Sequence, residues 1–242
     1  MSQQRVTLDF NRPFRLFPLP ACVLLPHATA PLHIFEQRYR DMLNEALDSD
    51  GLIAMAVTDA LDESMLTDPL NPPLRDTVTV GYVVHHDRLE DGRYNILLQG
   101  LCRARIVEEQ EPDARGIRRA RLRPVGHRRD QDSDRALESV RARVSDLLHE
   151  PALAELQKVQ VLQTLLDNTD VSTTAFLDLA GMVLSSDSDE RYALLAEDDA
   201  VERGQHVVHQ LQLMHELADH DPERDQSRGQ TRIDLEDGPG FD

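Results

Sequence analysis

The sequence that decides the fold runs Phe14-Arg-Leu-Phe-Pro-Leu-Pro-Ala-Cys-Val-Leu-Leu-Pro26 and resumes at Pro31-Leu-His-Ile-Phe-Glu-Gln-Arg-Tyr39. The first segment holds two short apolar runs closed by prolines, which predict strands at 14–19 and 21–25. Apolar residues then recur at helical spacing over 35–47. We therefore expect two strands followed by a short amphipathic helix.

Downstream of this helix, strand signals continue. We expect strands at 52–57, 80–89, 93–99 and 116–125, with a loop at 60–76 that contains three prolines. Asp91-Gly92 stands between two of these runs and predicts a hairpin with a type I′ turn, since such turns need positive φ at both central residues. Gly100 is expected to break the next run, which Ala104, Ile106 and Glu108 continue on one face.

The second half changes to helical spacing. Helices are expected at 130–149, 153–166, 172–184, 188–196 and 198–217, with Ser172 and Ser188 as N-caps. The predicted organisation is a β-rich lobe at 1–127, an all-α lobe at 128–218 and a disordered acidic tail at 219–242. Strands followed by helices predict the α+β class.

The charge balance limits the partners. The chain has 242 residues with 26 basic and 44 acidic side chains, for a formal net charge of −18. Such a chain repels phosphate backbones and anionic membranes, so both are disfavoured. It contains no apolar run of about 18 residues and no apolar signal segment, and it has two cysteines. These features predict a cytoplasmic protein without disulfides.

The opening motif resembles the N-terminal domain of Lon proteases, of the peptidase S16 family. The likeness continues downstream, at the distance from the opening motif that the family shows. The hairpin of that family is similar to the segment Asp91-Gly-Arg-Tyr-Asn-Ile-Leu-Leu-Gln-Gly-Leu-Cys-Arg-Ala-Arg-Ile-Val-Glu-Glu109. The resemblance covers about 14–217. It departs at Leu25, where the family has phenylalanine, and at His27, where glycine is common. It implies a barrel of the pseudouridine-synthase-associated (PUA-like) type, a helical bundle, and a non-catalytic module that binds unfolded or extended polypeptide.

The sequence gives little support for an enzyme active site. A P-loop needs Gly-Lys-Ser or Gly-Lys-Thr, and neither occurs. The sole lysine, Lys158, lies within a predicted helix, so neither an ATPase nor a Ser-Lys protease site is expected. We predict no catalytic residue, metal or cofactor. Paired histidines at 85–86 and at 206 and 209 are poor metal sites, and His27 and His33 favour hydrogen-bonding roles.

Five residues form the candidate peptide groove: Glu36, Arg38, Tyr39, Asn95 and Arg103. The structural interpretation makes Glu36 a favourable charge at a helix start, Arg38 an ion-pair partner of a strand, and Tyr39 a packed ring. The functional interpretation makes them the lining of a groove for extended peptide, and the resemblance supplies that reading. The structural interpretation is favoured, because buried ion pairs are mainly architectural.

Two functions from different classes remain open. The first is binding of unfolded or extended polypeptide, as an adaptor beside a protease or chaperone; open barrel edges allow a peptide strand to add. The second is an RNA-binding or small-molecule-binding module. It would use an arginine cluster at 103–129, made of Arg103, Arg105, Arg115, Arg118, Arg119, Arg121, Arg123, Arg128 and Arg129. Arginines interspersed with glutamates more often form a mixed solvated face.

Overall fold

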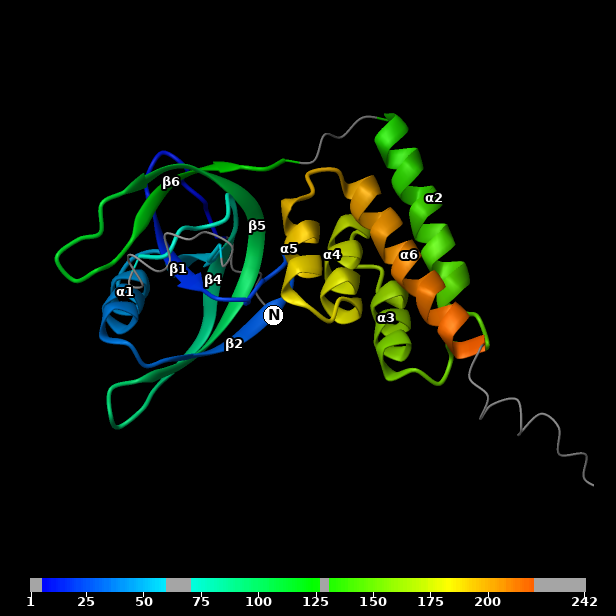
Figure 1. Ribbon diagram of the computed structural model, residues 1–242, viewed down its shortest axis with the longest axis horizontal. Helices are drawn as coiled ribbons and strands as arrows, with labels where there is room; N and C mark the ends of the chain where they lie inside the picture. The colour runs from blue at the N-terminus through cyan, green and yellow to red at the C-terminus, as the bar shows by residue number, and fades with distance from the viewer. Residues whose placement is uncertain (1–5, 60–70, 127–130, 220–242) are drawn as a thin grey trace, which may run out of the picture.

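A β-barrel lobe and a helical lobe lie side by side (Figure 1). The computed structural model describes residues 6–59, 71–126 and 131–219. The barrel lobe contains β1 (Phe14–Leu19), β2 (Thr29–Ile34), α1 (Gln37–Leu47), β3 (Leu52–Val57), β4 (Thr77–Arg88), β5 (Tyr94–Gln110) and β6 (Arg119–Pro124). The helical lobe contains α2 (Gln131–Leu148), α3 (Gln157–Asp167), α4 (Thr173–Leu184), α5 (Ser188–Ala196) and α6 (Ala200–Asp219). The predicted α+β class is confirmed.

One long strand closes the barrel. The sheet order is β2-β5-β4-β3-β1-β6, and β6 pairs back with β5. The first half of β5 pairs with β2 and β4, and its second half pairs with β4 and β6. Because β5 has 17 residues, it can serve both ends of the sheet. Among the described strands, β2 pairs with β5 alone, so its other edge is free.

The strand predicted at 21–25 is wrong, and the strand lies later, at β2. Residues 22–25 are irregular; Cys22 is half-buried, and residues 23–25 are buried. Leu24 packs in the barrel core, whereas Val23 and Leu25 pack with leucines of α5. An apolar run that contacts two lobes therefore imitates a buried strand. Pro31 in turn obscures β2, because proline is confined to edge strands.

The predicted strand break at Gly100 is also wrong, since β5 continues through it. The N–H of Gly100 donates to the carbonyl of Ala28 (2.9 Å), and its own carbonyl accepts from the N–H of His27 (2.8 Å). A Cβ at this position would lie 2.5 Å from the carbonyl oxygen of Leu25. Glycine is thus present because two backbones approach closely.

Gly100→Ala is expected to lower the free energy of unfolding by about 1–3 kcal/mol, since backbone atoms on both sides must move apart. Gly126→Ala is the matched control, because nothing lies within 4 Å of a Cβ there. Urea denaturation of both variants measures the difference. Equal stability of the two variants would show that the strand accommodates the methyl group.

The predicted hairpin between β4 and β5 is present, but its turn differs from type I′. The N–H of Gly92 donates to the carbonyl of Leu89 (2.9 Å), and the N–H of Leu89 donates to the carbonyl of Arg93 (2.8 Å). Gly92 has a φ of 79°, whereas Asp91 does not have positive φ. This is a three-residue loop with glycine in the left-handed position.

One predicted N-cap is confirmed, another is wrong, and helix α1 begins later than predicted. Ser172 caps α4 by accepting from the N–H of Ala175 (3.3 Å). The N-cap of α5 is Asp187 rather than Ser188. Helix α1 begins at Gln37, and Phe35 is 60% exposed rather than part of the buried face.

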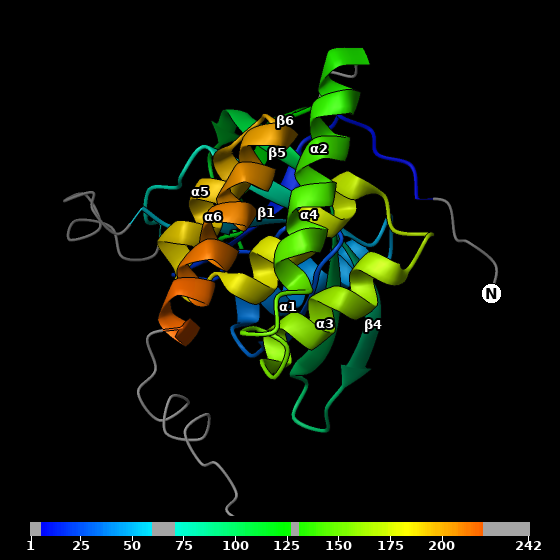
Figure 2. The ribbon, with the colours of Figure 1, turned by 90° about the vertical axis from the view of Figure 1, so that its right-hand side faces the viewer.

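Helix α4 contacts both lobes. One side carries Phe176, Leu177 and Ala180 into the core of the helical lobe. On the other side, Leu179 and Met182 pack against the barrel core. Figure 2 shows the helices stacked in front of the barrel. The predicted loop at 60–76 lies mostly outside the described residues, as does the predicted tail beyond Asp219.

Candidate functional site

The five predicted groove residues lie in three separate places. Glu36, Arg38 and Tyr39 lie at the start of α1. Asn95 is an exposed residue in the first half of β5, and Arg103 is buried between the lobes. The structure therefore does not bring them together in one groove.

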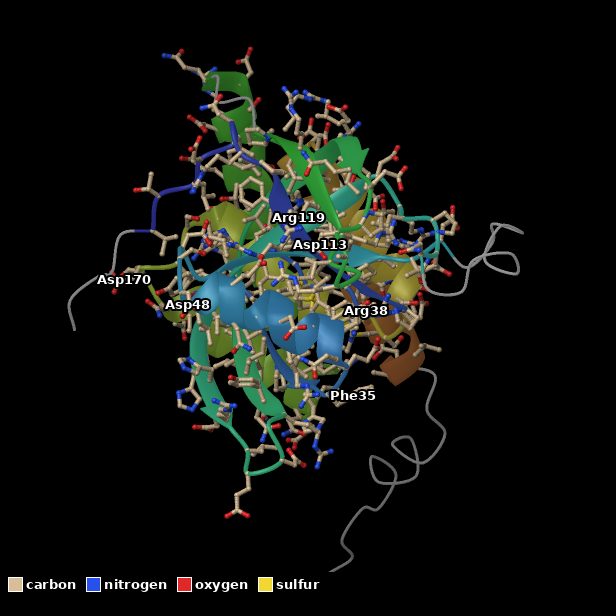
Figure 3. All side chains as sticks on the ribbon, turned by 90° about the vertical axis from the view of Figure 1, so that its left-hand side faces the viewer. Phe35, Arg38, Asp48, Asp113, Arg119 and Asp170 are labelled. Atoms are coloured by element: carbon tan, nitrogen blue, oxygen red, sulfur yellow. The ribbon has the colours of Figure 1, made fainter. Side chains whose placement is uncertain are left out.

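At the start of α1, the side chains contact one another. Glu36 occupies the N-cap position, but its carboxylate makes no capping hydrogen bond and accepts instead from Nε of Arg38 (3.0 Å). The guanidinium of Arg38 lies over the ring of Tyr39, 4.5 Å from its centroid. Figure 3 shows Phe35 and Arg38 at this end of the helix.

Tyr39 is held in place by the barrel. Its ring meets Phe17 edge-on at 4.7 Å, and its hydroxyl donates to the carbonyl of Pro18 (3.5 Å). Burial raises the pKa of Tyr39, so the phenol stays protonated. These contacts fit the architectural interpretation of Tyr39.

Asn95 belongs to an exposed chain of side-chain hydrogen bonds, which we call the Asn95 chain. Nδ1 of His33 donates to Oδ1 of Asn95 (2.7 Å), and Nη1 of Arg93 donates to Nε2 of the same ring (3.2 Å). The His33 ring stacks on exposed Phe35 at 6.2 Å. The hydrogen-bonding role expected for His33 is therefore seen.

Arg103 binds the two lobes together. Its two amino groups donate to the carboxylate of Asp178 at 2.8 and 2.7 Å, and Nε donates to the carbonyl of Leu195 (3.2 Å). Nε of Arg203 donates to the same carboxylate (3.1 Å). All three charged side chains are at most 6% exposed. Sequence spacing gave no signal for this triad, because its members come from β5, α4 and α6.

The outward faces of β2, β5 and β4 form one surface, which we call the outer sheet face. Cross-strand partners share a face of a sheet. On β2 and β5, Thr29 is opposite Gln99, Pro31 is opposite Leu97, and His33 is opposite Asn95. On β4, Tyr82 is opposite the same Gln99. Residues 96 and 98 of β5 point inward and are buried, which confirms the alternation. The outer sheet face thus joins the Asn95 chain to apolar positions further along β5.

An apolar groove lies at one end of the outer sheet face. It has a volume of about 390 Å³ and is lined by Val6, Leu8, Tyr82, Val84, Gln99 and Leu101. The segment at 6–8 supplies one wall, and β4 and β5 supply the floor. Val84 is 43% exposed. We call this site the N-terminal groove; the alternating apolar residues Val6, Leu8 and Phe10 are the sequence signal that could have indicated it.

Most of the arginine cluster is engaged with carboxylates. Ion pairs join Arg105 to Asp198, Arg118 to Glu109, Arg121 to Glu108, and both Arg115 and Arg119 to Glu45 and Asp113. Figure 3 shows Asp113 and Arg119 above α1. Burial acts to raise the pKa of Asp113, but hydrogen bonds from Ile117, Arg119 and Arg115 outweigh it and lower this pKa. Such pairing leaves little free positive charge for a phosphate backbone. Arg128 and Arg129 lie outside the described residues.

Cysteine and metal chemistry have no visible site in the described part of the chain. Burial raises the pKa of Cys102 to about 11 and also raises that of Cys22, so neither is an activated thiolate. Within residues 6–59, 71–126 and 131–219, no three His, Cys, Asp or Glu side chains gather in a way that could hold a metal ion. None of the helices described is both long and apolar enough to cross a membrane.

Comparison with known proteins points to one family. A family model for the ATP-dependent protease La (LON) substrate-binding domain matches residues 14–212. The Lon protease of Geobacter metallireducens is 25% identical over 207 residues, which cover 84% of this chain and 24% of that protease. A Lon protease of Helicobacter pylori is 23% identical over 201 residues, covering 82% and 23%. The chain thus spans about a quarter of the length of these relatives.

Two solved structures share the fold. The N terminal domain of Mycobacterium avium complex Lon protease gives a TM-score of 0.61 at 16% identity, covering 83% of this chain and 98% of that one. A Lon N-terminal domain protein from Xanthomonas campestris gives 0.51 at 20% identity, covering 81% and 97%. At these identities the likeness shows the architecture alone.

Proposed function

Because the chain belongs to the ATP-dependent protease La (LON) substrate-binding domain family, we propose that it binds unfolded or extended polypeptide and catalyses no reaction itself. The family supports substrate recognition in general. The finer proposal is that this chain acts as an adaptor in protein quality control, beside a protease or chaperone, in the cytoplasm. Two free cysteines are consistent with a reducing compartment.

The observation that carries the proposal is the N-terminal groove. Four of its six lining residues are aliphatic, and its volume of about 390 Å³ lies within the range of ligand pockets. An extended chain directs alternate side chains to one side, so one apolar side chain can enter the groove while the backbone crosses the outer sheet face. Unfolded polypeptides expose such side chains, whereas folded ones bury them.

Addition of a peptide strand at the free edge of β2 would contribute less to polypeptide binding than docking of a side chain in the N-terminal groove. The carbonyl of Ala28 accepts from Gly100 on β5, so alternate residues of β2 turn their backbone groups toward β5. Thr29, Pro31 and His33 therefore turn theirs toward the free edge. Pro31 has no N–H, so an added strand would lack its central hydrogen bond. Side-chain docking in the groove is the mode that the geometry favours.

Val84→Glu is expected to weaken binding of unfolded polypeptide at least tenfold, which corresponds to about 1.4 kcal/mol, because it places a charge on the floor of the groove. Val107→Glu is the matched control, since Val107 is also exposed (61%) and lies on β5 away from the groove. The measurement is fluorescence titration of a carboxymethylated, permanently unfolded model protein. Wild-type affinity in both variants would remove the groove from the proposal.

The same preparations test the other functions. ATP hydrolysis and casein cleavage are expected to stay at background. A short single-stranded RNA is expected to bind weakly and to dissociate as salt rises. Tight RNA binding that weakens in Arg123→Gln, or turnover that persists through purification, would contradict the proposed function.

A further inference from the structure

A second cavity lies between the two lobes and is distinct from the N-terminal groove. It has a volume of about 150 Å³, and its lining includes His27, Arg103, Thr174, Asp178 and Arg203. These residues come from the turn before β2, from β5, and from α4 and α6. We propose that this cavity binds a small oxyanion, of carboxylate or phosphate chemistry, which links the barrel to the helical lobe.

The first observation is the balance of buried charge. Two guanidinium groups, Arg103 and Arg203, are 6% and 4% exposed, and they share the single buried carboxylate of Asp178. The other acid in the lining, Asp198, is paired with Arg105 and half exposed. A buried cation that lacks its own counterion is costly, so an anion in the cavity would lower the free energy of the folded state.

The second observation is an unused donor. Nε of Arg203 donates to Asp178, and Nη1 donates to the carbonyls of Glu197 and Asp198 at 2.9 and 3.1 Å. Nη2 makes no hydrogen bond to any residue in the described part of the chain. Because the side chain lines the cavity, this amino group can donate into it. Guanidinium groups suit planar, charge-assisted recognition of carboxylate and phosphate oxygens.

The third observation is the backbone of His27. Its φ is 68°, in the left-handed region that favours glycine. Non-glycine residues in this region are uncommon and gather at functional sites. His27 keeps part of its surface exposed, and partial burial is the main cause that lowers its pKa, with Asp178 raising it and Arg103 lowering it. The imidazole is therefore neutral near pH 7 and offers one N–H donor beside the arginines.

The size of the cavity fixes the class of ligand. Pockets for drug-sized molecules start at about 300 Å³, and this cavity is about 150 Å³. A single oxyanion fits, whereas a nucleotide does not. Thr174 lies in the first turn of α4, where the helix dipole also favours negative charge.

Thermal unfolding of the whole chain tests the proposal, because a ligand that binds only the folded state stabilises it by RT ln(1 + [L]/Kd), so that Tm rises with ligand concentration. The arms are sodium phosphate, a short peptide with a free C-terminal carboxylate, the same peptide amidated, and sodium chloride at equal ionic strength. We expect Tm to rise with the logarithm of the concentration of phosphate, of the free carboxylate, or of both, beyond the change seen with chloride. The arm that responds tells whether the source is a free ion or a chain end.

Two variants give the specificity control. His27→Gly relieves the left-handed residue and so keeps the fold, and it is expected to need at least tenfold more ligand for the same rise. His86→Ala, an exposed histidine on β4, is expected to match the wild type. A rise that appears equally with chloride or the amidated peptide, or that persists unchanged in His27→Gly, would overturn the proposal. Polypeptide binding in the N-terminal groove is measured separately and does not depend on this result.

Discussion

Asp178→Asn is expected to lower the free energy of unfolding by about 3–5 kcal/mol, the range measured when one partner of a buried ion pair is removed. The substitution keeps the size of the side chain and removes its charge. Arg103 and Arg203 would then lie almost fully buried, at 6% and 4% exposure, without their shared carboxylate. The amide would also present an N–H₂ group toward guanidinium donors.

The control for this prediction is Asp198→Asn. Asp198 pairs with Arg105 at 2.8 Å, but both side chains are well exposed, at 51% and 39%. Exposed pairs contribute between about 0 and 1 kcal/mol. Urea denaturation of the two variants compares the same chemical change at a buried aspartate and at an exposed one. A loss below 1 kcal/mol in both would mean that the backbone carbonyls around the arginines suffice to stabilise their charge.

Phe176→Ala is expected to lower the free energy of unfolding by about 3–5 kcal/mol, because it leaves a large cavity in the core of the helical lobe. The Phe176 ring is fully buried, and the guanidinium of Arg141 lies 5.4 Å from its centroid. Phe35→Ala is the matched control, since that ring is 60% exposed and its loss should change stability by less than about 0.5 kcal/mol.

The Phe176 variant also tests whether the lobes unfold together. Circular dichroism follows the helices, whereas tyrosine fluorescence follows mainly the barrel, which holds Tyr39, Tyr82 and Tyr94. The chain has no tryptophan to obscure this signal. Because α4 packs on both lobes, we expect both probes to shift to the same lower denaturant midpoint. If the helical signal alone shifts, the lobes unfold independently.

Local patterns predicted the elements whose contacts are local. The opening motif indicated β1 and α1, the helical spacing indicated all five helices of the second lobe, and Asp91-Gly92 indicated the hairpin. The errors arise where distant contacts decide. Residues 22–25 are apolar because they meet α5 and the barrel core, and Gly100 is present because the backbone at Leu25 approaches it.

The candidate site was harder to predict for the same reason. The N-terminal groove combines residues 6–8 with β4 and β5, which lie some 75 to 95 positions away. The triad of Arg103, Asp178 and Arg203 spans a similar range. No local spacing encodes such pairs. Arginine pairing with acids was foreseeable as a tendency from the interspersed charges, but the choice of Glu45 and Asp113 as partners depends on the position of α1 and the turn before β6.

Pro31 on the free edge of β2 also affects the tendency of the protein to aggregate. An unpaired edge is a template on which other chains can extend a sheet, and proline is one of the residues that interrupt it. A protein that works beside unfolded chains meets exposed strands at high local concentration. If the chain binds unfolded polypeptide as proposed, the missing N–H at Pro31 would let it hold such a chain through side-chain contacts without being recruited, strand by strand, into the aggregates that its ligands form.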